Sequence, residues 1–412
     1  MSKLQEEILG NYISVSSGEG LPESRMKPGG YFVYGGNGIS GMHNTFLFER
    51  QQLIIGRVGA HCGNVYITKE NSWITDNALI VSFKEPEKEI IFWYYFLQNL
   101  KLREKAFQNA QPVITGGIIN RIKISIPSFP EQQRIAKILS TADAVIEKTQ
   151  VAIAKYKAMK QGMLQDLFTR GIDTTTNQLR PRYEDAPHLY KESKLGMIPK
   201  EWEVDTLENL TDKIGSGVTP TGGSEVYKTS GVLFIRSQNV LIGSLSIEDA
   251  AFITKEIDEQ MEGSRVKPFD VLLNITGASI GRCAYFPEDL QLANVNQHVC
   301  IIRFKQNSKP RAVFAAEYFN SDFIQRQIYK AMAVGNREGL NFQQTKAFIY
   351  PVIDTEELDN ISPILENLNR TLQTEQTYLQ KIQLLKKGLM EDLLTGKKLV
   401  KVEEELTTQN EN

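Results

Sequence analysis

The chain has few of the residues that build metal sites and disulfides. Among its 412 residues are three cysteines and four histidines. Cys62, Cys283 and Cys300 form no Cys-x-x-Cys pair, and the histidines are scattered. Because a structural zinc site needs four ligands at characteristic spacings, the common zinc folds are excluded. We therefore expect reduced thiols and no bound metal.

Long apolar runs and a large net charge are also missing. No apolar stretch approaches the roughly 18 residues of a membrane span, and the N-terminus lacks a basic segment followed by an apolar run. We expect a cytoplasmic protein that is neither exported nor membrane-spanning. The net charge of −2 counts mildly against a simple nucleic-acid binder, although a local basic groove can be offset by acidic surfaces elsewhere.

Catalytic signatures are absent as well. The glycine-rich stretch 215–220 has no lysine to reach a phosphate, so it is not a Walker loop. Neither a Gly-x-Ser-x-Gly elbow nor a His-Glu-x-x-His motif occurs. The Asn/Asp-Pro-Pro-aromatic signature of adenine methyltransferases is missing too. We therefore expect no catalysis and no cofactor on this chain.

The chain does contain a repeated sequence that is typical of a long helix. Residues 162–169 reappear as residues 388–395, at an offset of 388 − 162 = 226. Apolar residues recur at heptad spacing through both copies, which is typical of a helix with one partner helix. The first predicted seam is Ile135, Leu139, Ile146, Ile153, Met163 and Leu167, and the second is Ile361, Leu365, Leu372, Leu379, Leu389 and Leu393. Polar residues interrupt the two apolar seams at matching positions, because Thr149 corresponds to Glu375 and Lys160 corresponds to Lys386.

Each seam runs for about 35 residues, or about 50 Å of helix at 1.5 Å per residue. Neither helix can bury its stripe alone, so we predict that the two copies pair as an antiparallel coiled coil. Two alternatives remain open at this point. Each helix could pack on its own domain, or either helix could mediate dimerisation.

The segments around the helices are similar to each other. Both contain strand-like runs that flank a glycine loop, Gly59-Ala60-x-x-Gly63 and Gly277-Ala278-x-x-Gly281, at an offset of 218. We predict an α+β fold with an internal pseudo-twofold repeat, in which two β-rich domains are separated by the two long helices. The predicted order is a first β-rich domain (1–130), a central long helix (131–171), a linker (172–200), a second β-rich domain (201–350), a C-terminal long helix (351–400) and a disordered tail (401–412).

Polar side chains gather on and near the glycine loops. Arginine, asparagine, glutamine, serine and threonine are the residues that read base edges or hold phosphates. The glycines alone could merely shape a turn between two strands, but their polar neighbours favour DNA reading. The candidate DNA contacts are Asn37, Arg57, His61, Asn64, Thr219, Arg236, Gln238, Asn239, Thr276, Ser279, Arg282, Asn296, Gln297 and His298.

Together with several sequence motifs, these residues make the chain resemble the specificity subunits of type I restriction-modification systems. The resemblance rests on Leu195-Gly196-x-Ile198-Pro199-x-x-Trp202, Gly215-Ser216-Gly217-x-Thr219-Pro220, Arg236-x-x-Asn239, Asn274-x-Thr276-Gly277-Ala278-x-x-Gly281, Ile126-Pro127-x-x-x-Pro130-Glu131-Gln132-x-x-Ile135 and the two closing helix segments. The first half departs from this pattern. It lacks the Leu-Gly-x-Ile-Pro entry, and Gly56-Arg57 stands where the second half has Asn274-Ile275.

The resemblance implies a non-catalytic subunit in which each β-rich domain is a target recognition domain for one half of a split, asymmetric site on double-stranded DNA. The paired helices would set the gap between the halves and dock two methyltransferase subunits. S-adenosylmethionine, ATP and Mg²⁺ would belong to the methyltransferase and the restriction and translocase subunits. Two other hypotheses remain: a coiled-coil scaffold for proteins without DNA specificity, and an enzyme with an unrecognised site.

Overall fold

The computed structural model describes residues 6–107, 111–334 and 339–400. The chain forms two compact units, described here one at a time. Unit 1 comprises Met1–Ala152 with Gln376–Asn412, and unit 2 comprises Ile153–Glu375. The predicted disordered tail, 401–412, lies outside the described residues. No helix in the described part of the chain is long and apolar enough to cross a membrane.

Unit 1 is built on two small sheets. The first has the strand order β2-β8-β5-β6, and the second has the order β4-β3-β7. Their bounds are β2 (Ile13–Ser17), β5 (Leu53–Gly56), β6 (Val65–Ile67), β8 (Ala78–Phe83), β3 (Tyr31–Gly35), β4 (Gly38–His43) and β7 (Trp73–Ile74). The apolar run of β5 is buried on both faces, which explains why it does not alternate with polar residues. A short pair, β1 (Glu7–Ile8) with β9 (Lys123–Ile124), leads toward the long helix.

Three helices complete this domain: α1 (Ile90–Asn99), α2 (Leu102–Lys105) and α3 (Gly116–Asn120). The sequence pattern predicts one aromatic helix around residues 89–104. The structure divides it at Lys101, which adopts a left-handed conformation with φ of 49°. Helix α1 buries Phe92, Trp93 and Phe96 in the core shared with β5 and β8. The core therefore forms where the sheet meets the aromatic helix.

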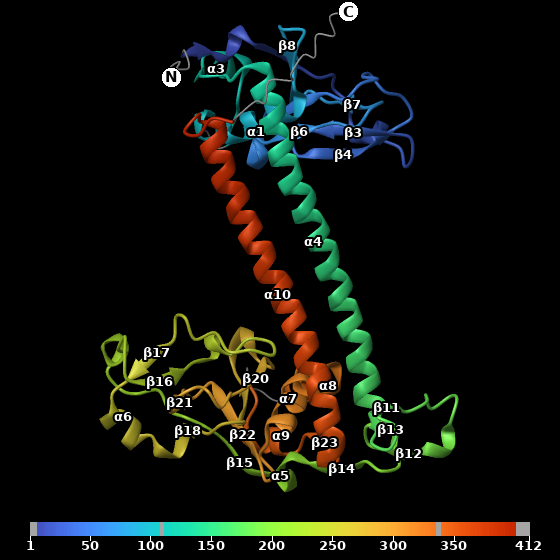
Figure 1. The fold of residues 1–412 in the computed structure, drawn as a ribbon, viewed down its shortest axis with the longest axis vertical. Coiled ribbons are helices and arrows are strands. Elements are labelled where there is room, and N and C mark those ends of the chain that lie inside the picture. The colour runs from blue at the N-terminus through green and yellow to red at the C-terminus, as the bar shows by residue number, and fades with distance from the viewer. Residues whose placement is uncertain (1–5, 108–110, 335–338, 401–412) are drawn as a thin grey trace, which may run out of the picture. The chain divides into compact units, whose positions relative to one another are not determined.

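Unit 2 repeats this plan with one more strand in its second sheet (Figure 1). One sheet has the order β15-β22-β19-β20, and a second has the order β17-β16-β21-β18. Their bounds are β15 (Thr211–Ser216), β19 (Val271–Asn274), β20 (Cys283–Tyr285), β22 (Val299–Phe304), β16 (Val232–Ile235), β17 (Ala251–Ile253), β18 (Arg265–Val266) and β21 (Ala293–Val295). The helices are α5 (Leu207–Leu210), α6 (Lys255–Gln260), α7 (Lys309–Phe319), α8 (Asp322–Val334) and α9 (Phe342–Lys346), and β14 (Glu203–Thr206) pairs with β23 (Ile349–Val352).

Strand pairing confirms the internal repeat. In unit 1 the pairs are Leu53 with Ile67 and Ile55 with Val65, and in unit 2 they are Val271 with Tyr285 and Leu273 with Cys283. All four pairs obey the offset of 218 predicted from the glycine loops. Each second sheet also contains a parallel pair, β3 with β7 and β16 with β21. The two domains therefore share a strand order as well as a motif.

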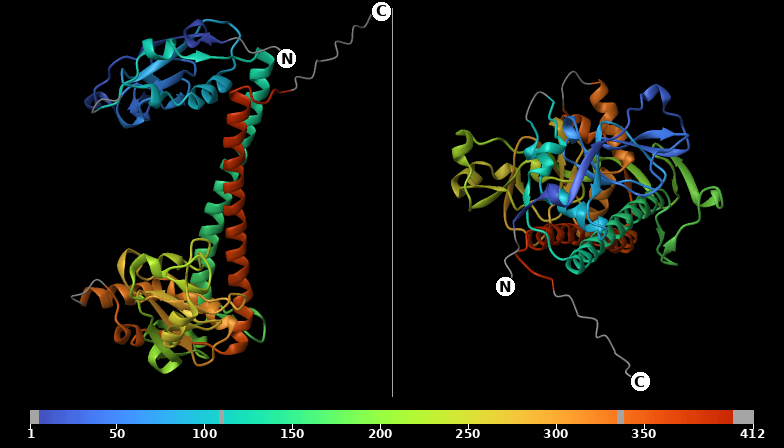
Figure 2. Two further views of the ribbon diagram at one scale, coloured as in Figure 1. Left: turned by 90° about the vertical axis from the view of Figure 1, so that its left-hand side faces the viewer. Right: turned by 90° about the horizontal axis from the view of Figure 1, so that it is seen from above.

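The two long helices are α4 (Phe129–Thr169) and α10 (Thr355–Leu394), and both units contain part of each. In unit 1 the beginning of α4 packs on the end of α10, since Ile135 and Leu139 share a core with Leu393. In unit 2 the end of α4 packs on the beginning of α10, since Leu167 shares a core with Ile361. This is antiparallel pairing in both units, as predicted, and the helix segments run side by side in both views (Figures 1 and 2).

Every residue of the predicted seams is buried or half-buried. The matched interruption at Lys160 and Lys386 has a structural explanation. In unit 2, Lys160 pairs with Glu317 of α7 at 2.8 Å and donates to Asn369 Oδ1 of α10 at 2.6 Å. Asn369 in turn donates to Glu317 at 2.8 Å. The lysine therefore joins both long helices to the helix of the β-rich domain.

Unit 1 contains a corresponding cluster around Lys386, but its carboxylate lies on a long helix and not on the β-rich domain. Lys386 of α10 pairs with Asp143 of α4 at 2.5 Å, and Tyr95 of α1 donates to the same carboxylate at 2.5 Å. Burial, together with the hydrogen bond to Asp143, raises the pKa of Tyr95, so the phenol remains a donor. Lys386 also lies 5.0 Å from the centre of the Tyr95 ring. We call these two clusters the unit 1 triad (Tyr95, Asp143, Lys386) and the unit 2 triad (Lys160, Glu317, Asn369).

The segment predicted as a linker, 172–200, is folded onto unit 2. It forms two hairpins, β10 (Ile172–Asp173) with β11 (Gln178–Leu179) and β12 (Tyr190–Ser193) with β13 (Gly196–Pro199). Their anchor is Glu357 of α10, which is buried and accepts hydrogen bonds from Arg180 at 2.6 and 3.0 Å, from Trp202 Nε1 at 2.9 Å and from the Ile172 amide at 2.7 Å. The hairpins are therefore tied to the long helix by a paired internal charge.

Gly171 ends α4 beside this anchor. It has φ of +60°, and a Cβ there would lie 2.0 Å from Glu357 Oε1. Only glycine fits both the left-handed turn and the close approach. The same kind of stop explains why α10 ends at Leu394, since Gly396 has φ of 71°. The predicted continuation of this helix to residue 400 was therefore too long.

Replacing Glu357 with alanine should lower the free energy of unfolding of unit 2 by about 3–5 kcal/mol, because the change leaves the Arg180 guanidinium buried without its partner. Cysteine labelling in increasing urea can measure this by unit. Cys283 and Cys300 report on unit 2, Cys62 reports on unit 1, and all three side chains are fully buried. Burial raises the pKa of Cys300 to about 12 and that of Cys283 well above its ordinary value, so neither thiol reacts before the unit opens.

The matched control for this experiment is Glu356→Ala, one residue earlier on the same helix, where the side chain is exposed. It should leave the urea midpoints of all three cysteines within experimental error. An equal, small shift for Glu356→Ala and Glu357→Ala would contradict the anchoring role.

Candidate nucleic-acid interface

The glycine loop has the same backbone geometry in both units. In unit 1 the Gly56 amide donates to the Asn64 carbonyl and the Gly63 amide to the Gly56 carbonyl, both at 2.8 Å. In unit 2 the corresponding bonds, Asn274 to Arg282 and Gly281 to Asn274, are both 2.9 Å. The first glycine of each loop has a positive φ, 79° at Gly59 and 73° at Gly277, and so does the last. The glycines thus form a defined scaffold that presents the residues between them.

In unit 2 this loop opens into a surface hollow of about 410 Å³, which we call the loop hollow. Three separate segments contribute to it: the turn after β16, the glycine loop after β19 and the turn before β22. Five of the predicted DNA contacts line it together. The full lining is Ser237, Gln238, Thr276, Gly277, Ala278, Ser279, Arg282 and His298.

Exposed polar groups at the loop hollow offer both donors and acceptors. Gln238 and Arg282 are exposed, and so is Gln297 beside His298. Thr276 Oγ1 and His298 Nδ1 are 2.6 Å apart, which fixes the orientation of the imidazole ring. An arginine and two amides displayed on a fixed frame are suited to reading the hydrogen-bonding edges of base pairs. Within the described residues no cluster of His, Cys, Asp or Glu could hold a metal ion.

Two of the predicted contacts lie inside the domain instead. Asn239 is 3% exposed, its Oδ1 accepts from the Arg236 amide at 3.0 Å, and its Nδ2 donates to the Ser246 carbonyl at 2.9 Å. Asn296 is 7% exposed, and its Oδ1 accepts from the His298 amide at 3.1 Å. Both side chains shape the turns that carry Gln238 and His298. They are therefore corrected from candidate base contacts to structural supports of the loop hollow.

Thr219 and Arg236 also lie outside the lining of the loop hollow. Thr219 is exposed in the segment after β15. The Arg236 guanidinium lies 5.3 Å from the centre of the Tyr227 ring, and its Nε is buried without a hydrogen-bond partner among the described residues. This stacking draws the arginine toward its own domain.

The predicted contacts of unit 1 form two small groups. Asn64 donates to the Tyr66 hydroxyl at 3.2 Å, and that hydroxyl donates to Asn37 at 3.4 Å. Arg57 donates to Ser17 Oγ at 2.8 Å and is half-buried. His61 is exposed on the glycine loop. The structure therefore links Asn37 with Asn64 and leaves Arg57 bound to the strand β2.

The repeat identifies a residue that the sequence analysis missed. The amide of Arg57 bonds to the carbonyl of Asn77 at 2.9 Å, as the amide of Ile275 bonds to that of His298 at 3.0 Å. Asn77 therefore occupies the position of His298, and it is exposed. The signal was present in the polar residues that precede both strands, but the offset there is 298 − 77 = 221 instead of 218. Ser237 was also missed.

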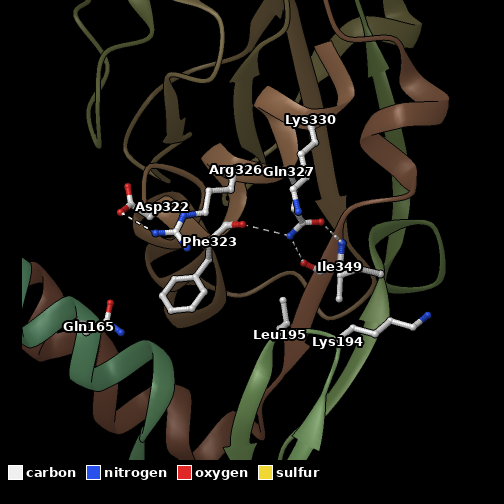
Figure 3. Close-up of a pocket in the computed structure, with 9 residues that line it drawn as sticks. All are labelled: Gln165, Lys194, Leu195, Asp322, Phe323, Arg326, Gln327, Lys330 and Ile349. Atoms are coloured by element: carbon white, nitrogen blue, oxygen red, sulfur yellow. Dashed lines mark hydrogen bonds and ion pairs between the residues drawn. The ribbon is translucent and has the colours of Figure 1, made fainter. Parts of the chain in front are cut away.

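A second depression, of about 390 Å³, lies on unit 2 and shares no lining residue with the loop hollow. Figure 3 shows the Phe323 ring between Gln165 and Leu195, with the side chains of Asp322 and Arg326 side by side. At its centre Gln327 bonds to both backbone groups of Ile349, at 2.8 and 2.9 Å. The depression therefore marks the joint where the hairpin β12–β13 meets α8, β23 and the end of α4.

Comparisons with known proteins agree with this architecture. The family described as "Type I restriction modification DNA specificity domain" matches residues 11–155. The MjaVIII specificity subunit of Methanocaldococcus jannaschii is 25% identical over 83% of this chain and 78% of its own length. The EcoBI specificity subunit of Escherichia coli is 23% identical over 89% of this chain and 72% of its own.

A solved structure shares the fold. The S subunit of a type I restriction-modification system from M. genitalium has a TM-score of 0.65 at 17% identity, covering 94% of this chain and 95% of that one. A repeated β-rich domain with two long helices is thus a fold that this chain shares with a solved protein. Over most of its length the chain is therefore similar to specificity subunits of type I restriction-modification systems.

Proposed function

We propose that this chain is the DNA-reading subunit of a type I restriction-modification complex. Each β-rich domain reads one half of a bipartite, asymmetric site on double-stranded DNA. The observation that carries this proposal is the loop scaffold, which is built twice with the same backbone bonds but displays different side chains, Asn64 and Asn77 in unit 1 against Arg282 and His298 in unit 2. Identical frames with different polar groups suit the reading of two different sequences.

The helix pair has its own part in this proposal. It sets the length of DNA between the two half-sites and docks two methyltransferase subunits, which bring S-adenosylmethionine. Restriction and translocase subunits, which use ATP and Mg²⁺, join the same cytoplasmic complex. The small net charge is compatible with this arrangement, because partner subunits can supply much of the positive surface that holds DNA.

Methylation mapping tests the proposal directly. A bacterial host that expresses this chain with its neighbouring methyltransferase should acquire a bipartite motif containing N6-methyladenine, read by long-read sequencing. The methyltransferase alone, in the same host, should produce no such motif. If the two proteins copurify and still no new motif appears, the coiled-coil scaffold would be the better hypothesis.

Replacing Arg282 with alanine should weaken binding of the assembled complex to its site by about 1–3 kcal/mol and relax the sequence preference in one half-site. The guanidinium is exposed at the loop hollow, where it can donate two hydrogen bonds to a guanine. Lys305→Ala is the matched control, because it also removes one exposed positive charge from unit 2. His298, at the loop hollow, precedes β22, whereas Lys305 follows the other end of this strand. Equal losses on all sequences for Arg282→Ala would indicate a phosphate contact instead.

Shortening both helices by one heptad tests the spacing role. Deleting Val145–Val151 and Thr371–Thr377 shortens each helix by about 10 Å, or about three base pairs of DNA. Both deletions leave the residues of the two triads in place, so the antiparallel register is retained. The methylated motif should keep its two half-sites with a shorter gap, and altered half-sites would contradict independent reading by the two domains.

A further inference from the structure

Asn274 ties together the two loops that form the loop hollow. It ends β19 and is fully buried. Its Nδ2 donates to the carbonyl of Ser237 at 2.8 Å and to Ser279 Oγ at 3.1 Å. Ser237 and Ser279 both line the hollow but belong to different segments of the chain. Within the described residues Asn274 Oδ1 has no hydrogen-bond partner. The side chain of Asn274 therefore forms hydrogen bonds only through Nδ2, the group that joins the two loops.

The corresponding residue in unit 1 is Gly56, and it has no side chain to do this. A Cβ on Gly56 would lie 2.3 Å from the Gly36 carbonyl oxygen and 2.5 Å from the His61 carbonyl oxygen. Gly36 and His61 occupy the positions of Ser237 and Ser279 in the repeat. In unit 1 the two loops therefore fill with their own backbone the space that a side chain fills in unit 2.

The match between these positions rests on hydrogen bonds as well as sequence. The Thr75 amide bonds to the Tyr34 carbonyl at 2.8 Å, and the Asn296 amide bonds to that of Ile235 at 3.1 Å. Two residues further along, Tyr34 leads to Gly36 and Ile235 leads to Ser237. The difference at Gly56 and Asn274 is thus a substitution within one shared frame.

We propose that Asn274 is a positioning residue for sequence recognition. It holds the loop of Gln238 and the loop of Arg282 apart at a fixed separation, and that separation decides which base edges the two side chains can reach together. Gly56 sets a closer separation in unit 1. Asn274 does not touch DNA itself. This inference rests on the proposed function, since it assigns a determinant of specificity to the site already described.

Two substitutions of Asn274 test the inference in the full complex with the neighbouring methyltransferase. Asn274→Asp keeps the shape but replaces the donor with an oxygen that faces the Ser237 carbonyl, and Asn274→Gly copies unit 1. Binding is measured on the methylated motif and on single-base variants of each half-site. Discrimination should fall at least about tenfold in the half-site that Arg282→Ala affects, and remain at the wild-type value in the other.

Gln327→Glu is the matched control. Gln327 bonds to both backbone groups of Ile349, at 2.8 and 2.9 Å, so the same amide-to-carboxylate change disturbs the fold of the same unit away from the loop hollow. It should lower the urea midpoint for Cys283 labelling without changing the motif. Wild-type discrimination in both Asn274 variants would overturn the inference.

Gly56→Ala keeps the inference falsifiable if the Asn274 variants fail to fold. The added methyl group should push the unit 1 loops apart and reduce discrimination in the other half-site only. An unchanged preference there, in a folded protein, would overturn the inference. A wild-type complex that methylates no bipartite motif would instead refute the proposed function, so the two failures are distinguishable.

Discussion

In each unit, a lysine links the β-rich domain to both long helices, and the register of the helix pair depends on this contact. The apolar seam supplies most of the stability, since each fully buried leucine or isoleucine contributes about 1.5–3 kcal/mol. An apolar seam alone does not fix register, because leucines can slide by a heptad. In unit 2, Lys160 meets Glu317 and Asn369 at a single position along the helix pair. A slip by one heptad would leave a buried carboxylate without its partner, which makes the observed register the favoured one.

Fixed register gives meaning to the repeated loop scaffold. Each glycine loop is built by backbone hydrogen bonds, so its shape does not depend on the side chains it displays. The displayed residues, such as Asn77 in unit 1 and His298 in unit 2, can differ without altering the frame. The frame and the displayed groups are therefore made of different atoms: the backbone, the glycines and buried asparagines such as Asn274 hold the loops, while the exposed side chains are available for recognition.

Sequence reasoning succeeded where the signal is periodic or repeated. The heptad seam gave the antiparallel helix pair, and the offset of 218 gave the two glycine loops with their strand register. It failed where the fate of a polar side chain is decided by a distant segment. Asn239 and Gln238 are neighbours in sequence, yet one amide is buried against the Ser246 carbonyl and the other is exposed. The hairpins of 172–200 were missed because their anchor, Glu357, lies more than 150 residues away.

The two triads differ in where the acid lies, and this has a consequence for how such chains can be recombined. In unit 1 the long helix carries the acid, Asp143, and the domain carries Tyr95, whereas in unit 2 the domain carries the acid, Glu317, and the helix carries Asn369. Exchanging one β-rich domain without its following helix would leave one lysine facing no acid or two acids. A domain exchanged together with the first half of its own helix would bring one acid in every combination. The transferable module of this fold is therefore the domain plus half a helix.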